Sequence, residues 1–329
     1  MSPRLKNVLR YTISFLIGLA LVYWVFKGVD LNSILSRLGE VNYYWIIASV
    51  LIGLFSHYLR AVRWNLLLEP IVKPPKIDTT FPVVMSMYFV NLIIPRGGEV
   101  FRCGALKKTD NIPVSTSFGT VVAERFFDMI LLLAFLLIMV FVELDKFNFL
   151  YTQVFSDKVN SKSIYYLLIA GGVLITALLI IYLVFASRIK ESVIFIKVKT
   201  FVLEILKGLT SYRMVKNKLL FWVATILIWV AYFFMSYIVI FSISETANLS
   251  FEVGFMLLVL GGAAMATPVQ GGIGAFHILV SQGLALYGLS KESGLFFATI
   301  LHGAQFLSLL IAGSICIIYL MIFKFNKTT

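Results

Sequence analysis

The chain has 329 residues, of which 60% are hydrophobic and 13% are charged, and its mean hydropathy is +0.94. Soluble domains carry roughly 25% charged residues, so this composition excludes a soluble protein and indicates an integral membrane protein. The net charge of +12 does not indicate nucleic-acid binding, because the basic residues gather in a few loops, as they do beside cytoplasmic membrane surfaces.

The long apolar runs predict an all-α, polytopic helical bundle with about six spanning helices, since each run is close to or above the ~20 residues that a bilayer crossing requires. In chain order, the expected spans are Val8–Phe26, Tyr43–Leu68, Ser115–Val142, Ile164–Ala186, Leu219–Ile243 and Gly294–Phe323. Arg4, Lys6 and Arg10 lie before or at the start of the first run, and no small-residue cleavage site follows it. We therefore expect a retained helix rather than a signal peptide.

Two further apolar stretches are interrupted by glycines and a proline. The first break is Asn91-Leu-Ile-Ile-Pro95-Arg96-Gly97-Gly98-Glu99-Val-Phe-Arg102, within Thr79–Lys108, and the second is Pro268-Val-Gln270-Gly271-Gly272-Ile-Gly274, between Phe251–Ala266 and Ala275–Gly288. An interrupted helix at membrane depth survives only where its freed backbone groups face protein or a wet cavity. We therefore expect two re-entrant hairpins, the first entering from the cytoplasmic side and the second opening outward.

The order of span, span, hairpin and span occurs twice with opposite orientation, which indicates the inverted repeat of many transporters. The first repeat is expected at 1–142 and the second at 164–323, within a single transmembrane domain that covers 1–329. An amphipathic linker at 188–218 is expected on the inner leaflet. The distribution of Lys and Arg predicts an inner (cytoplasmic) membrane protein with both termini in the cytoplasm and the 143–162 loop outside.

The two breaks are candidate binding sites, because interrupted segments in matching places of two halves indicate a transporter's binding site. A half-helix starts after each break, and its unpaired N–H groups and positive dipole end favour an anion. The glycines also allow backbone angles that other residues avoid. The alternative is that they only permit tight helix packing. The candidate residues of the two breaks are Asn91, Arg96, Gly97, Gly98, Glu99, Arg102, Pro268, Gln270, Gly271, Gly272 and Gly274.

Glu124 and Asp128 lie four residues apart on one helix face, with Arg125 beside them. Like charges in this arrangement require a cation between them or a protonated partner. Ionisable residues inside the membrane are functional candidates, and we expect Arg96 or Arg102 from the first hairpin to pair with these carboxylates. A purely structural ion pair is the alternative.

Arg60 and Arg63 form a patch with Trp64 on the second expected span. At a rise of about 1.5 Å per residue, Arg60 lies near the cytoplasmic end of that helix. The patch is expected either to snorkel to the interface or to contact a lipid headgroup.

No motif of a hydrolase, a zinc protease or a nucleotide-binding loop occurs in the sequence, so we expect no enzyme. Cys103 and Cys316 lie far apart, and His57, His277 and His302 lack the spacing of metal ligands. We therefore expect no metal and no cofactor.

Four spaced motifs resemble the lysylphosphatidylglycerol synthase transmembrane-domain family, which includes the flippase portion of the multiple peptide resistance factor. They are Arg60-x-x-Arg63-Trp64, Asn91-x-x-x-Pro95-Arg96-Gly97-Gly98-Glu99-x-x-Arg102, Glu124-Arg125-x-x-Asp128 and Pro268-x-x-Gly271-Gly272-Ile-Gly274. The resemblance covers nearly the whole chain and implies an inner-membrane protein that handles lipids, in some members moving aminoacylated phosphatidylglycerol between leaflets. The sequence departs from the family in two ways. We expect no soluble aminoacyl-transferase domain, since none lies within these 329 residues, and His277 stands where an acidic residue often follows the second glycine motif.

These observations predict a lipid flippase or lipid-translocating transporter whose partners are membrane lipids rather than nucleic acid. We expect it to bind an anionic phospholipid or a polyprenyl-phosphate-linked lipid at the two breaks. Arg96 and Arg102 would neutralise the phosphate, while Glu124 and Asp128 hold the arginines. The alternatives are a membrane enzyme or accessory subunit acting on a lipid-linked substrate, and a lipid-binding scaffold without transport. The sequence leaves a homo-oligomer open.

Overall fold

The computed structural model describes residues 36–142, 203, 210–267 and 269–325, and every regular element in these ranges is helical. Four helices are long and apolar enough to cross a membrane, namely α3 (Tyr43–Leu68), α6 (Val114–Val142), α10 (Lys218–Tyr237, continued by the 3-10 turn η2, Ile238–Ser242) and α13 (Lys291–Phe323). Two pairs of shorter helices form the hairpins, α4 (Ile77–Ile93) with α5 (Gly97–Asp110) and α11 (Val253–Ala266) with α12 (Ala275–Ala285). Two further 3-10 turns are η1 (Arg37–Glu40) and η3 (Gln270–Gly272).

The predicted all-α membrane architecture is therefore confirmed, and the protein is a multi-pass membrane protein. Four of the expected spans correspond to long helices, with bounds that differ by a few residues at most. The expected spans at 8–26 and 164–186 lie outside the described residues, as do the 143–162 loop and most of the 188–218 linker. The number of crossings thus stays a prediction.

Three of the long helices begin at a side chain that accepts a hydrogen bond from the first turn. Asn42 Oδ1 accepts from the Tyr44 N–H at 3.1 Å, and Asn217 Oδ1 accepts from the Leu220 N–H at 2.9 Å. Ser290 caps α13 in the same way. Such caps satisfy one of the four unpaired N–H groups of a helix start, so they fix where each apolar run becomes helical.

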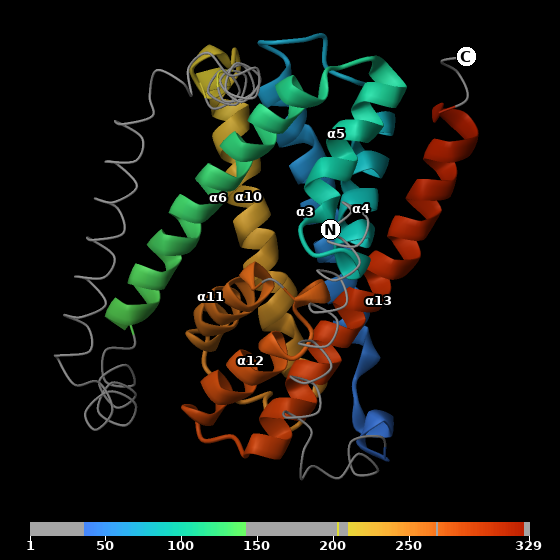
Figure 1. Ribbon diagram of the computed structural model, residues 1–329. Coiled ribbons are helices and arrows are strands. Elements are labelled where there is room, and N and C mark those ends of the chain that lie inside the picture. The colour runs from blue at the N-terminus through green and yellow to red at the C-terminus, as the bar shows by residue number, and fades with distance from the viewer. Residues whose placement is uncertain (1–35, 143–202, 204–209, 268, 326–329) are drawn as a thin grey trace, which may run out of the picture.

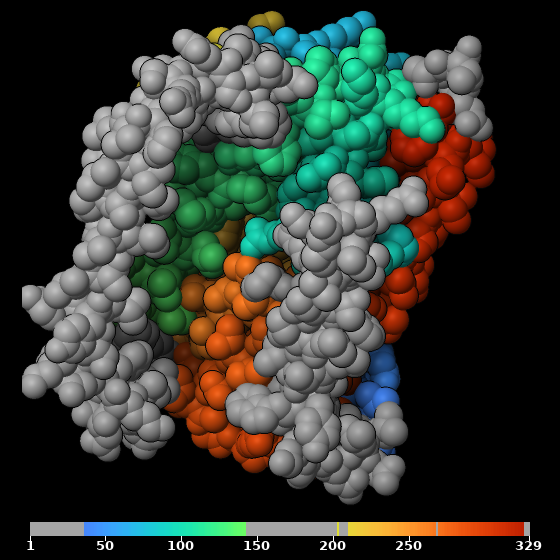
Figure 2. Space-filling view, viewed as in Figure 1, coloured from blue at the N-terminus to red at the C-terminus, as the bar shows by residue number. Residues whose placement is uncertain are grey.

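The two hairpins approach each other from opposite ends of the bundle. In Figure 1, α4 and α5 occupy the upper half and α11 and α12 the lower half, while the central helices α3 and α10 pack together and run in opposite directions. Figure 2 shows the hairpins in teal and orange between α6 in green and α13 in red. In the described residues each hairpin lies in sequence between two long helices, α3 and α6 for the first and α10 and α13 for the second, and the inverted repeat itself stays a prediction. The repeat boundaries remain predictions, because both expected N-terminal spans lie outside the described residues.

Each hairpin packs in its own apolar cluster. The first cluster joins α3, α4 and α5 around Trp64, Met87 and Leu106, and the second joins η2, α11, α12 and α13 around Phe276 and Phe297. Helix α13 belongs to both clusters, since its Phe297 lies in one and its Leu320 in the other. The two breaks thus lie between the two apolar clusters.

Candidate ligand site between the two hairpins

The first break places a left-handed backbone conformation on Arg96, with φ of +59°, and not on the glycines that follow. Gly97 and Gly98 thus do not use the freedom of glycine to adopt positive φ values. Gly98 is required for another reason, because a Cβ at this position would overlap the backbone carbonyl of Met87 on α4. The close approach of α5 to α4 therefore supports the packing role for Gly98.

The start of α5 is occupied by side chains of the hairpin itself. Asn91 Oδ1 accepts a hydrogen bond from the Gly98 N–H at 2.8 Å, and Asn91 Nδ2 donates to Glu99 Oε2 at 3.3 Å. The Gly97 N–H donates to the Ile94 carbonyl at 2.9 Å. The amide and the carboxylate thus take the polar positions at which we expected a phosphate, and Asn91 links the end of α4 to the first turn of α5.

The glycines of the second break, by contrast, do adopt positive φ values. Gly271, Gly272 and Gly274 have φ values of +55°, +72° and +83°. His302 Nε2 lies 2.8 Å from the Gly271 carbonyl oxygen, and the His302 ring stacks on Phe276 with the centroids 4.8 Å apart. A histidine of α13 therefore holds the interrupted backbone. Gln270 begins η3, whereas Pro268 lies outside the described residues.

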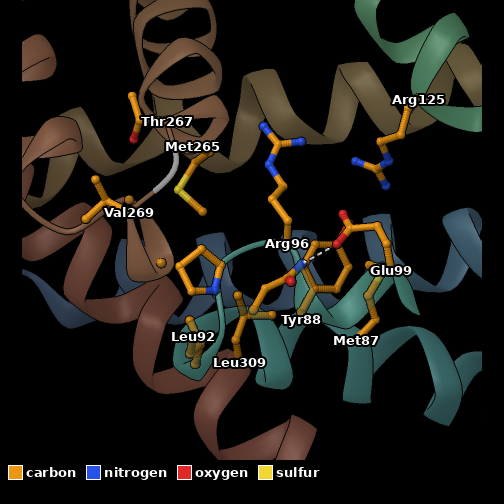
Figure 3. A pocket seen from close by; sticks show the side chains of 14 residues that line it. Met87, Tyr88, Leu92, Arg96, Glu99, Arg125, Met265, Thr267, Val269 and Leu309 are labelled. Atoms are coloured by element: carbon orange, nitrogen blue, oxygen red, sulfur yellow. Dashed lines mark hydrogen bonds between the residues drawn. The ribbon is translucent and has the colours of Figure 1, made fainter. Parts of the chain in front are cut away.

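The two breaks meet at the centre of the protein. Arg96 Nη2 donates to the carbonyl oxygen of Ala266, the last residue of α11, at 2.7 Å. A pocket of about 150 Å³ lies at this junction. Its lining comes from both hairpins, from α6 and from α13, and consists of Met87, Tyr88, Asn91, Leu92, Pro95, Arg96, Glu99, Arg125, Met265, Thr267, Val269, Gly271, Gly272 and Leu309. Figure 3 shows Arg96, Arg125 and Glu99 among these residues, with the dashed bond between Asn91 and Glu99.

A buried group of charged residues lies beside the pocket, and we call it the arginine network. It consists of Arg60 and Arg63 on α3, Arg102 on α5, and Glu124, Arg125 and Asp128 on α6. Arg60, Arg63, Arg102 and Glu124 are each at most 3% exposed. The snorkelling alternative for Arg60 and Arg63 is therefore wrong, because both side chains are buried in the protein.

Glu124 contacts all four arginines of the network. Its Oε2 accepts from Arg102 Nη1 at 3.0 Å, and its Oε1 accepts from Arg125 Nη2 at 3.1 Å. Arg63 Nη2 lies 3.4 Å from the same Oε1, and Arg60 Nη1 also donates to it. The predicted pairing with Arg102 is confirmed, whereas the alternative partner, Arg96, bonds Ala266 instead.

Asp128 supplies the second carboxylate. Its Oδ1 accepts from Arg63 Nη2 at 2.8 Å and its Oδ2 accepts from Arg60 Nη1 at 2.9 Å. Arg125 Nη1 lies 3.8 Å from that Oδ2. The sequence reasoning missed Arg60 and Arg63 as partners. Their signal was present in charge complementarity, since two arginines one turn apart on one apolar helix match two carboxylates one turn apart on another.

Aromatic residues support the network. The guanidinium carbon of Arg102 lies 4.4 Å from the centroid of the Trp64 ring, and the indole N–H of Trp64 donates to Thr120 Oγ1 at 2.9 Å. Such stacking stabilises an arginine that water cannot reach. The network thus fastens α3, α5 and α6 together.

The network holds more positive than negative charge, because four arginines share two carboxylates. Several of its buried guanidinium nitrogens have no hydrogen-bond partner among the described residues, including Nε and Nη2 of Arg102 and Nε and Nη1 of Arg63. Of the network residues, Arg125 alone also lines the pocket, and its side chain is 35% exposed. The excess positive charge therefore reaches the pocket through Arg125. Within the described ranges, no three His, Cys, Asp or Glu residues are grouped as metal ligands.

The sequence matches the family model described as the lysylphosphatidylglycerol synthase TM region over residues 11–313. The chain belongs to this family. It is 28% identical over 138 residues to the UPF0104 membrane protein MJ1595 of Methanocaldococcus jannaschii, a match that covers 41% of this chain and 40% of that protein. It is 26% identical over 103 residues to glycosyltransferase AglD of Haloferax volcanii, covering 31% of this chain and 16% of that protein. The matches thus span less than half the length of each relative, and no solved structure matches the chain.

Proposed function

We propose that this protein moves lipids between the leaflets of an inner membrane and binds the phosphate of the lipid headgroup in the pocket between the hairpin tips. The observation that carries the proposal is the presence of Arg96 and Arg125 in one pocket at the junction of two interrupted helices. In transporters built from repeats, the substrate binds where such helices meet. The family membership supports a function related to lipids.

In the proposed mechanism, Arg96 and Arg125 bind the phosphate and the arginine network keeps Arg125 in place. A guanidinium donates two parallel hydrogen bonds to a phosphate, which a lysine cannot do. Arg125 Nη2 donates to Glu124, whereas Nη1 lies 3.8 Å from Asp128 Oδ2, too far for a hydrogen bond, so Nη1 can donate to a ligand. Arg102 is buried against Glu124, so we assign the second phosphate-binding position to Arg125 instead of Arg102.

The lining of the pocket also suits an amphipathic ligand. Apolar side chains such as Leu92, Met265 and Leu309 stand beside the charged ones, and this mixed lining supports a ligand with a charged headgroup and an apolar part. The proposed orientation keeps both termini in the cytoplasm, following the distribution of Lys and Arg.

Reconstitution in vesicles tests this function. Wild-type protein should accelerate the loss of dithionite-resistant fluorescence for NBD-labelled phosphatidylglycerol or for a fluorescent polyprenyl phosphate. Arg125→Gln should reduce the rate about tenfold or more, because a hydrogen bond to a charged group contributes about 1.5–3 kcal/mol. Arg213→Gln is the matched control, since Arg213 is exposed and lies outside the pocket lining. If neither lipid moves faster than in empty vesicles, the proposal is wrong.

The alternative function is chemistry on a lipid-linked substrate, either as an enzyme or as an accessory subunit. It is favoured by the likeness to a protein whose name is glycosyltransferase, although the match covers only 16% of that relative. The same vesicles separate the alternatives, because a changed mass of the recovered lipid would indicate turnover. Retention of unchanged lipid without translocation would indicate a scaffold.

A further inference from the structure

The arginine network has one hydrogen-bond partner from the second half of the described chain. Tyr232 lies on α10, and its hydroxyl oxygen accepts from Arg60 Nε at 3.2 Å and from Arg60 Nη2 at 3.0 Å. These two nitrogens form the side-on fork with which arginine binds an oxyanion. The fork is instead occupied by a neutral hydroxyl, and only Nη1 of Arg60 reaches the two carboxylates.

Arg60 and Arg125 share the same carboxylate oxygens. Both contact Glu124 Oε1, and both approach Asp128 Oδ2, at 2.9 Å for Arg60 and 3.8 Å for Arg125. Any stronger bond from Arg60 to these oxygens weakens the bonds that hold Arg125. The more donors Arg60 directs at the carboxylates, the weaker are the bonds of Arg125 to them, and the more strongly Arg125 can bind a ligand.

We propose that Tyr232 is a positioning residue for the phosphate site. The Tyr232 hydroxyl accepts from Nε and Nη2 of Arg60, so these two donors do not bind Glu124 and Asp128. The carboxylates therefore remain acceptors for Arg125. The inference rests on the proposed function in one respect, namely that Arg125 binds the phosphate of the ligand.

Tyr232→Phe removes the hydroxyl and keeps the ring. The freed Nε and Nη2 of Arg60 are buried, and the carboxylates are the acceptors that Arg60 already contacts, so we expect these donors to turn toward them. The bonds of Arg125 to Glu124 and Asp128 are then weaker, so Arg125 binds the anion more tightly. We expect the dissociation constant for a short-chain phosphatidylglycerol, measured by calorimetry in neutral detergent, to fall about fivefold, within the range of coupling for neighbours in one network.

Tighter binding should be accompanied by slower translocation, because a headgroup held more firmly leaves more slowly. A merely structural role would lower the thermal stability without tightening binding. Tyr58→Phe is the matched control, since Tyr58 is an exposed tyrosine on the same helix as Arg60. It should change neither quantity.

A double-mutant cycle decides whether Tyr232 acts through Arg60. In an Arg60→Lys background there is no side-on fork for the hydroxyl to occupy, so Tyr232→Phe should no longer change the affinity. An equal effect in both backgrounds would overturn the inference, as would unchanged or weaker binding by Tyr232→Phe alone. Failure of the wild type to bind phosphatidylglycerol would instead contradict the proposed phosphate site, so the two failures are distinguishable.

Discussion

Glu124 shows at the scale of one residue how the interior of this bundle tolerates charge. The carboxylate is fully buried and contacts four guanidinium groups, three of which reach its Oε1. Burying an ion is costly, and the cost is offset only when its partners surround it. The arginines depend on Glu124 in return, because they outnumber the acceptors.

Glu124→Gln should therefore destabilise the protein by about 3–5 kcal/mol, since it leaves buried guanidinium groups without their main partner. The measurement is the thermal unfolding temperature in detergent. Adding Arg102→Gln should recover part of the loss, because it removes one uncompensated charge. An exposed change such as Arg213→Gln should cost at most about 0.5 kcal/mol. A single mutant as stable as this control would show that the ion pairs contribute nothing to folding.

At the scale of an element, α5 depends on a contact between two helix backbones. Gly98 packs against the Met87 carbonyl, and Asn91 caps the same turn. The start of the helix is thereby fixed against α4, which in turn directs Arg96 across to α11. The left-handed backbone of Arg96, of a kind that costs about 1–3 kcal/mol, persists because these contacts determine it.

Gly98→Ala tests this dependence. The added methyl group would overlap backbone, which cannot move aside as a side chain can, so α5 must shift and the protein should lose stability. Gly104 lies on the same helix, and a methyl group added there would meet no neighbouring atom within 4 Å. Gly104→Ala should therefore stabilise the protein by about 0.5–1 kcal/mol. Unfolding temperatures of both variants provide the comparison, and opposite signs are the expected result.

Much of the fold, but less of the site, could be predicted from the sequence, and the reason differs between elements. The lengths of the apolar runs predicted the four long helices of the described residues, and the glycine-rich breaks predicted the two pairs of shorter helices. Arg60 and Arg63 could not be placed from their depth on one helix, because their partners depend on which helix packs against α3. The sequence does not show which residue of the first break adopts the left-handed conformation, because Gly98 is needed for packing and the turn is made at Arg96.

At the scale of the whole molecule, the starts of α10 and α13 lie at opposite ends of the bundle (Figure 1). The predicted orientation places Asn217, just before α10, in the cytoplasm and Ser290, just before α13, outside. After replacement of the two buried native cysteines, single cysteines at these positions should react differently with an impermeant thiol reagent in intact cells. Ser290→Cys should be labelled and Asn217→Cys should not. Labelling of Asn217→Cys alone would reverse the orientation.

The excess of arginines over carboxylates has a consequence for the energetics of movement. One elementary charge that crosses a potential of 100 mV gains or loses about 2.3 kcal/mol. Any rearrangement that carries the arginine network through part of the membrane field is therefore voltage-dependent, in proportion to its uncompensated charge and to the distance moved. An anion bound beside Arg125 cancels part of that charge, so the empty and the occupied protein respond to the membrane potential with different strength.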